Sequence, residues 1–165
     1  AYDWAKEYDE ELAKMLENKE YSLKVFGIER GNKKPRKDIS KWSDLRENLE
    51  YLYDEVFFTK PHQDEWQNIT DKEEIKTLLA EYLNMYDEND DKDTWFNKVK
   101  DLSEKYGYAR EVKEYKKNPE NFKGHVGDVS TVIRVALTGR KNTPDLYEIL
   151  KLMGKERVAK RFARI

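Results

Sequence analysis

Apolar side chains recur at helical spacing along almost the whole chain, and the clearest stripe lies near its end. Within residues 127–139 the apolar positions fall three or four residues apart, which predicts a helix with one buried face. Asp128 stands where an N-cap is expected, and Gly139 stands where a left-handed residue ends many helices. The members of this stripe are Val129, Val132, Ile133, Ala136 and Leu137.

A second helix is predicted to begin at Thr143 and to end at Gly154. Thr143 offers a capping hydroxyl, Pro144 suits the first helical position, and Asp145 places an acid in the first turn. Such a helix start beside cations is suited to bind anions, including phosphate. The apolar stripe of this helix consists of Leu146, Ile149, Leu150 and Met153.

Cations surround the connection between these two helices. Arg140 and Lys141 lie in the connection itself, and Arg134 is a lone cation on an otherwise apolar helix. Residues 109–165 hold 14 basic and 7 acidic side chains, whereas residues 1–108 hold 18 basic and 27 acidic ones, which gives +7 against −9. This asymmetry indicates a local face for a polyanion, although a solvated basic surface is the plainer interpretation.

The remaining apolar patterns predict helices as well, and no segment alternates as a strand would. In the helix of residues 40–58 the apolar face includes Trp42, and in the last helix Arg161 is expected to point outward. Thr94 is the expected cap of its helix. We therefore expect an all-α protein whose two small helical subdomains form an elongated helical cage. The other predicted helices cover residues 2–17, 21–28, 69–86, 94–106 and 155–165.

The segment 59–68 divides the predicted helices into two groups. Pro61 stops the preceding helix, and the residues that follow resemble a linker. We therefore predict one subdomain over residues 1–68 and another over residues 69–165.

A basic loop interrupts the first group of helices. Gly31 and Pro35 break the helical pattern there. The loop lies in the acidic part of the chain, so its positive charge contrasts with the residues around it. Two interpretations remain: a functional role, or a solvated surface. Its cations are Arg30, Lys33, Lys34, Arg36 and Lys37.

Composition and motifs offer little support for catalysis. The 165 residues include no cysteine, which excludes disulfides and thiol catalysis, and the two histidines are far apart in sequence, so they do not make a zinc site. The acidic loop 87–93 lacks the glycine and terminal glutamate of a helix-loop-helix calcium site. No apolar run approaches a membrane span. We therefore expect no metal, no cofactor and no membrane contact.

Several motifs together resemble a known family. The motifs are KPRKDISKWSDL at 34–45, GHVGDV at 124–129, VALTGR at 135–140, NTPDLYEIL at 142–150 and GKER at 154–157. Together they are similar to the C-terminal anticodon-binding region of bacterial glutamyl-tRNA synthetases, and most similar to clostridium-like members. The resemblance implies two helical subdomains that bind the anticodon loop of a tRNA.

The same resemblance implies which residues contact the RNA. Arg36 corresponds to the arginine that reads the third anticodon base. The base contacts implied at the later motifs are Arg134, Thr143, Pro144, Leu146 and Tyr147. Contacts to the tRNA backbone are assigned to Lys33, Lys34, Lys37, Arg140 and Lys141.

The family's two ATP-binding signatures do not occur in this sequence. The stretch alone is therefore expected to be inactive, while the resemblance implies a cytoplasmic glutamate–tRNA ligase as the parent protein, with ATP and Mg²⁺ at a separate catalytic domain. We expect the stretch to be a monomer whose partner is tRNA. Two alternatives remain: a helix-turn-helix protein that binds DNA through residues 129–153, and a helical protein-interaction scaffold without a nucleic-acid role.

Overall fold

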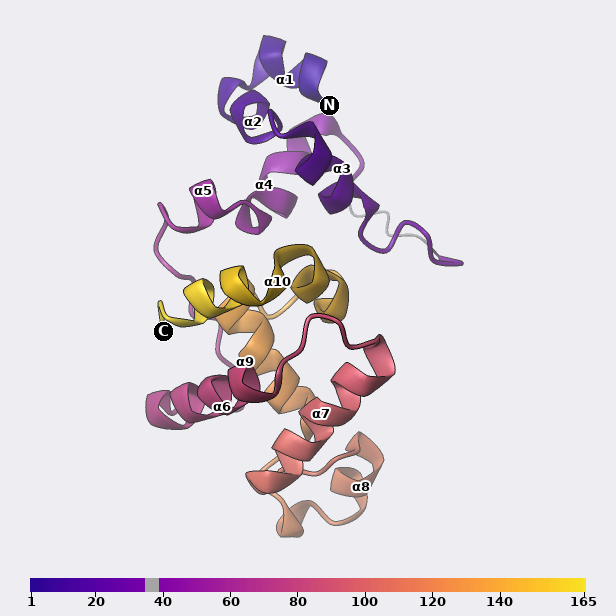
Figure 1. The fold of residues 1–165 in the computed structure, drawn as a ribbon, viewed down its shortest axis with the longest axis vertical. Helices are drawn as coiled ribbons and strands as arrows, with labels where there is room; N and C mark the ends of the chain where they lie inside the picture. The colour runs from indigo at the N-terminus through magenta and orange to yellow at the C-terminus, as the bar shows by residue number, and fades with distance from the viewer. Residues whose placement is uncertain (35–38) are drawn as a thin grey trace. The chain divides into compact units, whose positions relative to one another are not determined.

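The computed structural model describes residues 1–34 and 39–165, and these residues are almost entirely helical (Figure 1). They form ten α-helices and three short 3-10 helices, and within the described ranges the only β-type pairing is an isolated bridge between Ala109 and His125. The expectation of an all-α fold is confirmed. The predicted base contact Arg36 and the predicted backbone contact Lys37 lie outside the described residues.

Contacts divide the chain into two compact units, residues 1–62 and residues 63–165. Segment 63–68 belongs to the second unit, where the Asn68 amide donates a hydrogen bond of 2.6 Å to the Asp128 carboxylate. The predicted division lay after residue 68, and the assignment of both subdomains to anticodon binding stays a prediction.

The first unit begins with two short helices where one was predicted. Helix α1 covers Tyr2–Tyr8 and helix α2 covers Glu10–Met15. Asp9 separates them with a φ of −153° and a ψ of 89°, and its carboxylate accepts a hydrogen bond of 3.0 Å from the Leu12 amide. The apolar period runs through both helices, so periodicity alone could not reveal the cap between them. Helix α3 follows over Lys19–Gly27.

The predicted single helix over residues 40–58 is wrong. The chain forms short pieces instead, and Tyr53, with a ψ of 120°, breaks the helical backbone between the last two. This break buries the Tyr53 ring and allows its hydroxyl to donate a hydrogen bond of 3.0 Å to the Ser22 hydroxyl. Trp42, expected in the core, is 51% exposed. The pieces are η1 (Trp42–Asp44), α4 (Leu45–Leu49), η2 (Glu50–Leu52) and α5 (Asp54–Phe57).

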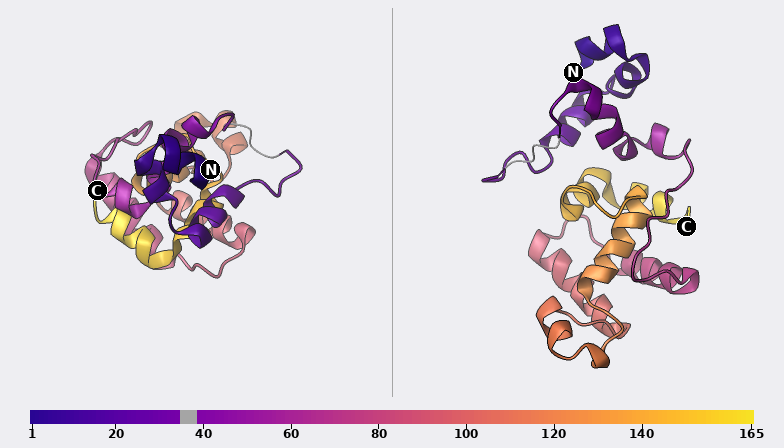
Figure 2. Two further views of the ribbon diagram at one scale, coloured as in Figure 1. Left: turned by 90° about the horizontal axis from the view of Figure 1, so that it is seen from above. Right: turned by 180° about the vertical axis from the view of Figure 1, so that it is seen from behind.

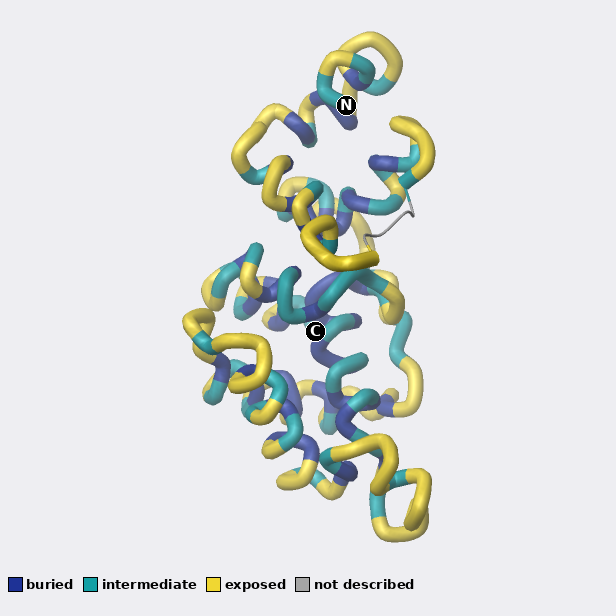
Figure 3. The backbone as a smooth tube through the Cα atoms, turned by 90° about the vertical axis from the view of Figure 1, so that its right-hand side faces the viewer, coloured by how far each residue is buried: buried dark blue, intermediate teal, exposed yellow. Residues whose placement is uncertain are grey.

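The second unit is assembled around helix α9, which covers Val126–Thr138. It packs against α6 (Lys72–Met85), α7 (Lys92–Lys105) and α10 (Leu146–Phe162). Seen from behind, the orange helix α9 runs through the middle of this unit (Figure 2, right). Its apolar stripe is buried. Figure 3 marks the buried segments of the chain in dark blue. This stripe packs against three helices, and the burial of its apolar side chains stabilises the unit.

Two helix starts in this unit differ from their predictions. His125, and not Asp128, is the N-cap of α9: its Nδ1 accepts a hydrogen bond of 3.0 Å from the Gly127 amide. Asp128 instead lies in the first turn and accepts a hydrogen bond of 2.9 Å from the His125 amide, which completes a capping box. Asp91, and not Thr94, caps α7.

Two glycines that were predicted to end helices both have left-handed φ values. Gly139 ends α9 with a φ of 78°, a left-handed conformation that a side chain disfavours. Gly154 has a φ of 75° and a ψ of 165° and kinks α10 where the helix was predicted to end. Helix α8 (Val112–Lys117) and the 3-10 helix η3 (Pro119–Asn121) connect α7 to α9.

Candidate nucleic-acid interface

The turn between α9 and α10 brings the later group of predicted contact residues together. Residues 139–145 form the connection, and segment 63–65 supports it from one side. A Cβ atom added to Gly139 would lie 3.3 Å from the Gln63 backbone nitrogen, and the Lys141 amide donates a hydrogen bond of 2.9 Å to the Glu65 carboxylate. Glycine at 139 therefore permits both the left-handed conformation and the close approach.

Arg134 is the residue that holds this turn in place. Its Nη1 donates to the carbonyl of Pro144 at 2.9 Å, to the hydroxyl of Thr143 and, at 3.4 Å, to the carbonyl of Thr143. The Thr143 hydroxyl in turn donates to the Pro144 carbonyl at 2.8 Å. The sequence marked Arg134 as a lone cation on an apolar helix; in the structure it satisfies backbone carbonyls ahead of α10.

Helix α10 starts two residues later than predicted. Asp145 is its N-cap, because its carboxylate accepts a hydrogen bond of 3.1 Å from the Glu148 amide. The same carboxylate forms an ion pair of 2.5 Å with Lys92 at the start of α7. The predicted cap Thr143 and the predicted first helical residue Pro144 thus lie in the turn, where Arg134 engages them.

Leu146 and Tyr147 follow the cap and connect the turn to α7. Leu146 is buried, while the half-buried Tyr147 directs its hydroxyl to the Asp90 carbonyl at 2.8 Å. The Tyr147 ring lies 5.6 Å from the ring of Trp95, centroid to centroid. These contacts fix the orientation of the aromatic ring beside the turn.

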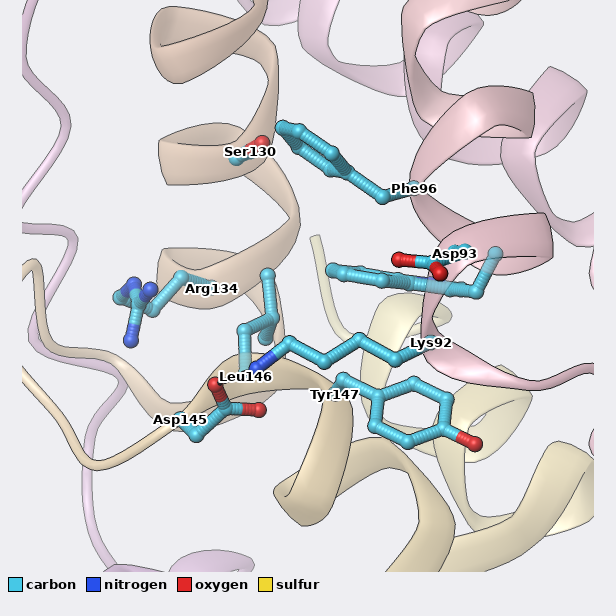
Figure 4. Close-up of a pocket in the computed structure, with 9 residues that line it drawn as sticks. Lys92, Asp93, Phe96, Ser130, Arg134, Asp145, Leu146 and Tyr147 are labelled. Carbon is cyan, nitrogen blue, oxygen red and sulfur yellow. Dashed lines mark hydrogen bonds and ion pairs between the residues drawn. The ribbon is translucent and has the colours of Figure 1, made fainter. Parts of the chain in front are cut away.

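A cavity of about 270 Å³ opens beside these side chains. It is lined by residues of α7, α9 and the start of α10 (Figure 4). Phe96 reaches toward Ser130 on one side, and the Lys92 side chain extends toward Asp145 on the other (Figure 4). The lining is therefore partly aromatic, with charged groups at the edge, which suits a planar ring that carries polar atoms. The lining residues are Lys92, Asp93, Trp95, Phe96, Ser130, Arg134, Asp145, Leu146 and Tyr147.

The predicted backbone contacts lie in both units. Lys141 is exposed in the turn and Arg140 is half-buried beside it, whereas Lys33 and Lys34 are exposed in the basic loop of the first unit. Sequence reasoning found the turn cations but missed the α7 side of the cavity, because residues 92–96 carry no motif of their own. The only signal there was an amphipathic helix that follows the acidic loop 87–93.

Arg161 corrects another expectation from the sequence. It was predicted to point outward, yet it is fully buried and its Nη1 donates a hydrogen bond of 2.9 Å to the Leu137 carbonyl. Leu137 lies in the last turn of α9, where backbone carbonyls lack partners within the helix. The arginine therefore links the end of α10 to the end of α9, just before the turn.

The described residues give no further chemistry to this site. Across residues 1–34 and 39–165, no three histidine, aspartate or glutamate side chains are grouped so that they could hold a metal ion. In the same ranges no helix combines the length and the apolar character needed to cross a membrane. What the arrangement offers is a basic turn, an aromatic-lined cavity and a rigid support.

Comparison with known proteins adds a family to this geometry. Residues 10–165 match the family described as "Anticodon binding domain". The chain is similar to the glutamate–tRNA ligase of Acetivibrio thermocellus, with 45% identity over 98% of this chain and 29% of that protein. It is equally similar to the ligase of Clostridium perfringens strain SM101, with 45% identity over 98% of the chain and 30% of the relative.

A third relative gives the same result. The glutamate–tRNA ligase of Sorangium cellulosum is 44% identical over 98% of this chain and 28% of its own length. The chain thus spans less than a third of the length of these curated relatives. No solved structure matches it.

Proposed function

Because the chain belongs to the anticodon-binding-domain family, we propose that it binds the anticodon loop of a tRNA as part of a glutamate–tRNA ligase. The observation that carries this proposal is the 45% identity to such ligases across 98% of the chain. The parent protein would join glutamate to tRNA with ATP and Mg²⁺ at another domain and would work in the cytoplasm. The chain itself would act as a monomer without catalytic activity.

The bases of the loop would bind at the turn before α10. Single-stranded RNA is read by stacking on aromatic rings and by hydrogen bonds to base edges. Tyr147, held by Asp90 and Trp95, offers a fixed ring, and the cavity beside it has room for a planar group. Arg134 supports Thr143 and Pro144, so part of its role would be to position the turn that the bases contact.

Phosphates of the same RNA would be held by cations around these contacts. Phosphate contacts orient a protein on nucleic acid without reading its sequence. The exposed Lys141 and its neighbour Arg140 suit this role in the second unit, and Lys33, Lys34 and Lys37 suit it in the first. Arg36 would read the third anticodon base from the same loop, since a guanidinium can form two hydrogen bonds to one base edge.

The geometry disfavours the helix-turn-helix alternative. Residues 139–145 separate α9 from α10, whereas the turn of that motif has about 3–4 residues. The connection is also braced by Arg134 and by segment 63–65. A protein–protein scaffold without nucleic-acid binding has no comparable support from the relatives.

The test is binding of a fluorescently labelled glutamate tRNA transcript by the 165-residue chain, followed by anisotropy at several salt concentrations. We expect Lys141→Gln to weaken binding and to reduce the slope of log K against log salt by about 0.7, the value for one phosphate contact on a single strand. Lys76→Gln on α6 is the matched control, because Lys76 is also exposed. Equal competition by a DNA duplex with the same number of phosphates would contradict the proposal.

A further inference from the structure

Helix α8 presents three lysines on one face, away from the turn. Lys113, Lys116 and Lys117 occupy positions i, i+3 and i+4, which project from the same side of a helix. All three are exposed. Tyr115 projects from the opposite side and packs against His125, with ring centroids 5.3 Å apart. The tyrosine anchors α8, so the three lysines, called here the lysine face, point outward.

The lysine face differs from its surroundings in its lack of ion pairs. Within the described part of the chain, none of its members has a carboxylate partner within 4 Å, although Glu114 lies on the same helix. Every other lysine or arginine between residues 92 and 123 has one. Those pairs are Lys92 with Asp145, Lys98 with Asp90, Lys100 with Glu111, Lys105 with Glu81, Arg110 with Asp101 and Glu104, and Lys123 with Glu74.

This contrast indicates a surface suited to an anionic partner. Among the described residues, ion pairs neutralise the other cations along α7 and the segment after it, whereas the three lysines of α8 form no such pair. Glu111, already paired with Lys100, is the one carboxylate whose pKa Lys113 helps to lower. Charges of like sign on adjacent helix turns repel one another, which destabilises a helix. A bound polyanion would offset this repulsion and release counterions.

The lysine face and the turn lie at opposite ends of α9. The Ala109 amide donates to the Gly124 carbonyl at 2.9 Å and the Val126 amide donates to the Ala109 carbonyl at 2.8 Å, which fixes the start of the α8 segment beside the start of α9 (Figure 1). Helix α9 ends at the turn. Its 13 residues, at about 1.5 Å per residue, separate the two sites by roughly 20 Å along the helix axis.

We propose that the lysine face binds backbone phosphates of the RNA stem next to the loop that the turn binds. The inference rests on the proposed function and extends it to a second contact. An RNA hairpin carries a continuous row of phosphates from its loop into its stem, so one molecule can reach two cationic sites about 20 Å apart. The stem contact reads phosphate and helix shape and carries no base identity.

The experiment compares two labelled RNAs in anisotropy titrations with the 165-residue chain: the anticodon stem-loop hairpin, and its loop sequence as a single strand. The test variant is Lys113→Gln with Lys117→Gln. The matched control is Lys72→Gln with Lys76→Gln, since these two lysines are also exposed and four residues apart, on α6. A Lys113→Arg, Lys117→Arg variant keeps the charge.

We expect the test variant to bind the hairpin about 10- to 60-fold more weakly at 0.1 M salt, with a salt slope smaller by about 1.8, which corresponds to two phosphates. Binding of the single strand should change less than twofold. The control variant and the arginine variant should bind the hairpin as the wild type does.

Unchanged hairpin binding by the test variant, or an equal loss in the α6 control, would overturn the lysine-face proposal. If Lys141→Gln still weakens binding of both RNAs in that case, the proposed function stands and only the stem contact is wrong. If the wild type binds neither RNA, both proposals are wrong. Circular dichroism of each variant verifies that the helices are intact.

Discussion

Replacement of Arg134 by alanine should loosen the turn as well as weaken RNA binding. The guanidinium donates two close hydrogen bonds, to the Thr143 hydroxyl and to the Pro144 carbonyl, and a longer one to the Thr143 carbonyl. A hydrogen bond from a charged donor contributes about 1.5–3 kcal/mol to stability. The side chain is only half-buried, so the lower end applies, and the Pro144 carbonyl keeps the Thr143 hydroxyl as a donor.

Arg134→Ala should therefore lower the free energy of unfolding of the second unit by about 2–3 kcal/mol. For a domain of about 100 residues, that loss lowers the melting temperature by roughly 10 °C or more. Urea unfolding monitored by tryptophan fluorescence is a suitable assay, because the buried Trp95 packs against Tyr147 next to the turn. Binding of the glutamate tRNA transcript should be measured at 10 °C, where the variant is folded.

A double-mutant cycle with Thr143→Val isolates the shared hydrogen bond. We expect a coupling energy of about 1 kcal/mol or more, because residues in one hydrogen-bond network are not additive. Purely additive effects, or an Arg134→Ala variant that keeps full stability while losing RNA binding, would refute the argument that Arg134 acts by holding the turn.

Three further predictions concern the second unit. Arg161→Ala should destabilise the second unit by about 3 kcal/mol or more, because it leaves the Leu137 carbonyl without this donor and opens a cavity. Thermal melting measures the loss, and an unchanged melting temperature would be incompatible with the buried position. Gly154→Ala should lower the free energy of unfolding by about 1–3 kcal/mol, because φ is 75° at Gly154 and the new Cβ would lie 2.9 Å from the Glu88 carboxylate. Ala159→Gly serves as a comparison at a regular helical position. A Gly154→Ala protein as stable as the wild type would be evidence against the kink. Burial, assisted by nearby Glu88, raises the pKa of Tyr86 to about 12. The tyrosine therefore contributes stability below pH 10 that is lost as the pH rises from about 10 to 12. Tyr86→Phe should reduce this alkaline loss in a circular-dichroism titration, and a titration curve identical to that of the wild type would count against this effect.

Sequence patterns predicted the second unit better than the first. The stripes of α6, α9 and α10 are long, and one buried face dominates each of them, so periodicity sufficed. In the first unit the stripe from Trp42 to Val56 has the same period, yet burial of the Tyr53 ring breaks the helix. That preference depends on Ser22, thirty-one residues away, and local pattern does not contain it.

The details of the site were less predictable for a related reason. Several residues that can cap a helix stand next to one another at His125–Asp128 and at Thr143–Asp145, and tertiary contacts decide which one does so. Asp145 is available as a cap because Arg134 holds Thr143 in the turn. Arg161 is buried because of a tertiary contact as well, since it donates a hydrogen bond to the Leu137 carbonyl. Charged residues on a helical period do not reveal such partners.

The central proposal is that this chain binds the anticodon end of a tRNA, and a footprint tests it most directly. Hydroxyl radicals cleave the backbone of an end-labelled glutamate tRNA transcript, and the bound chain protects the nucleotides that it covers. We predict protection confined to the anticodon loop and its stem, lost from the stem alone in the Lys113→Gln, Lys117→Gln variant. Protection of the acceptor end, or a cleavage pattern identical with and without saturating protein, would contradict the account.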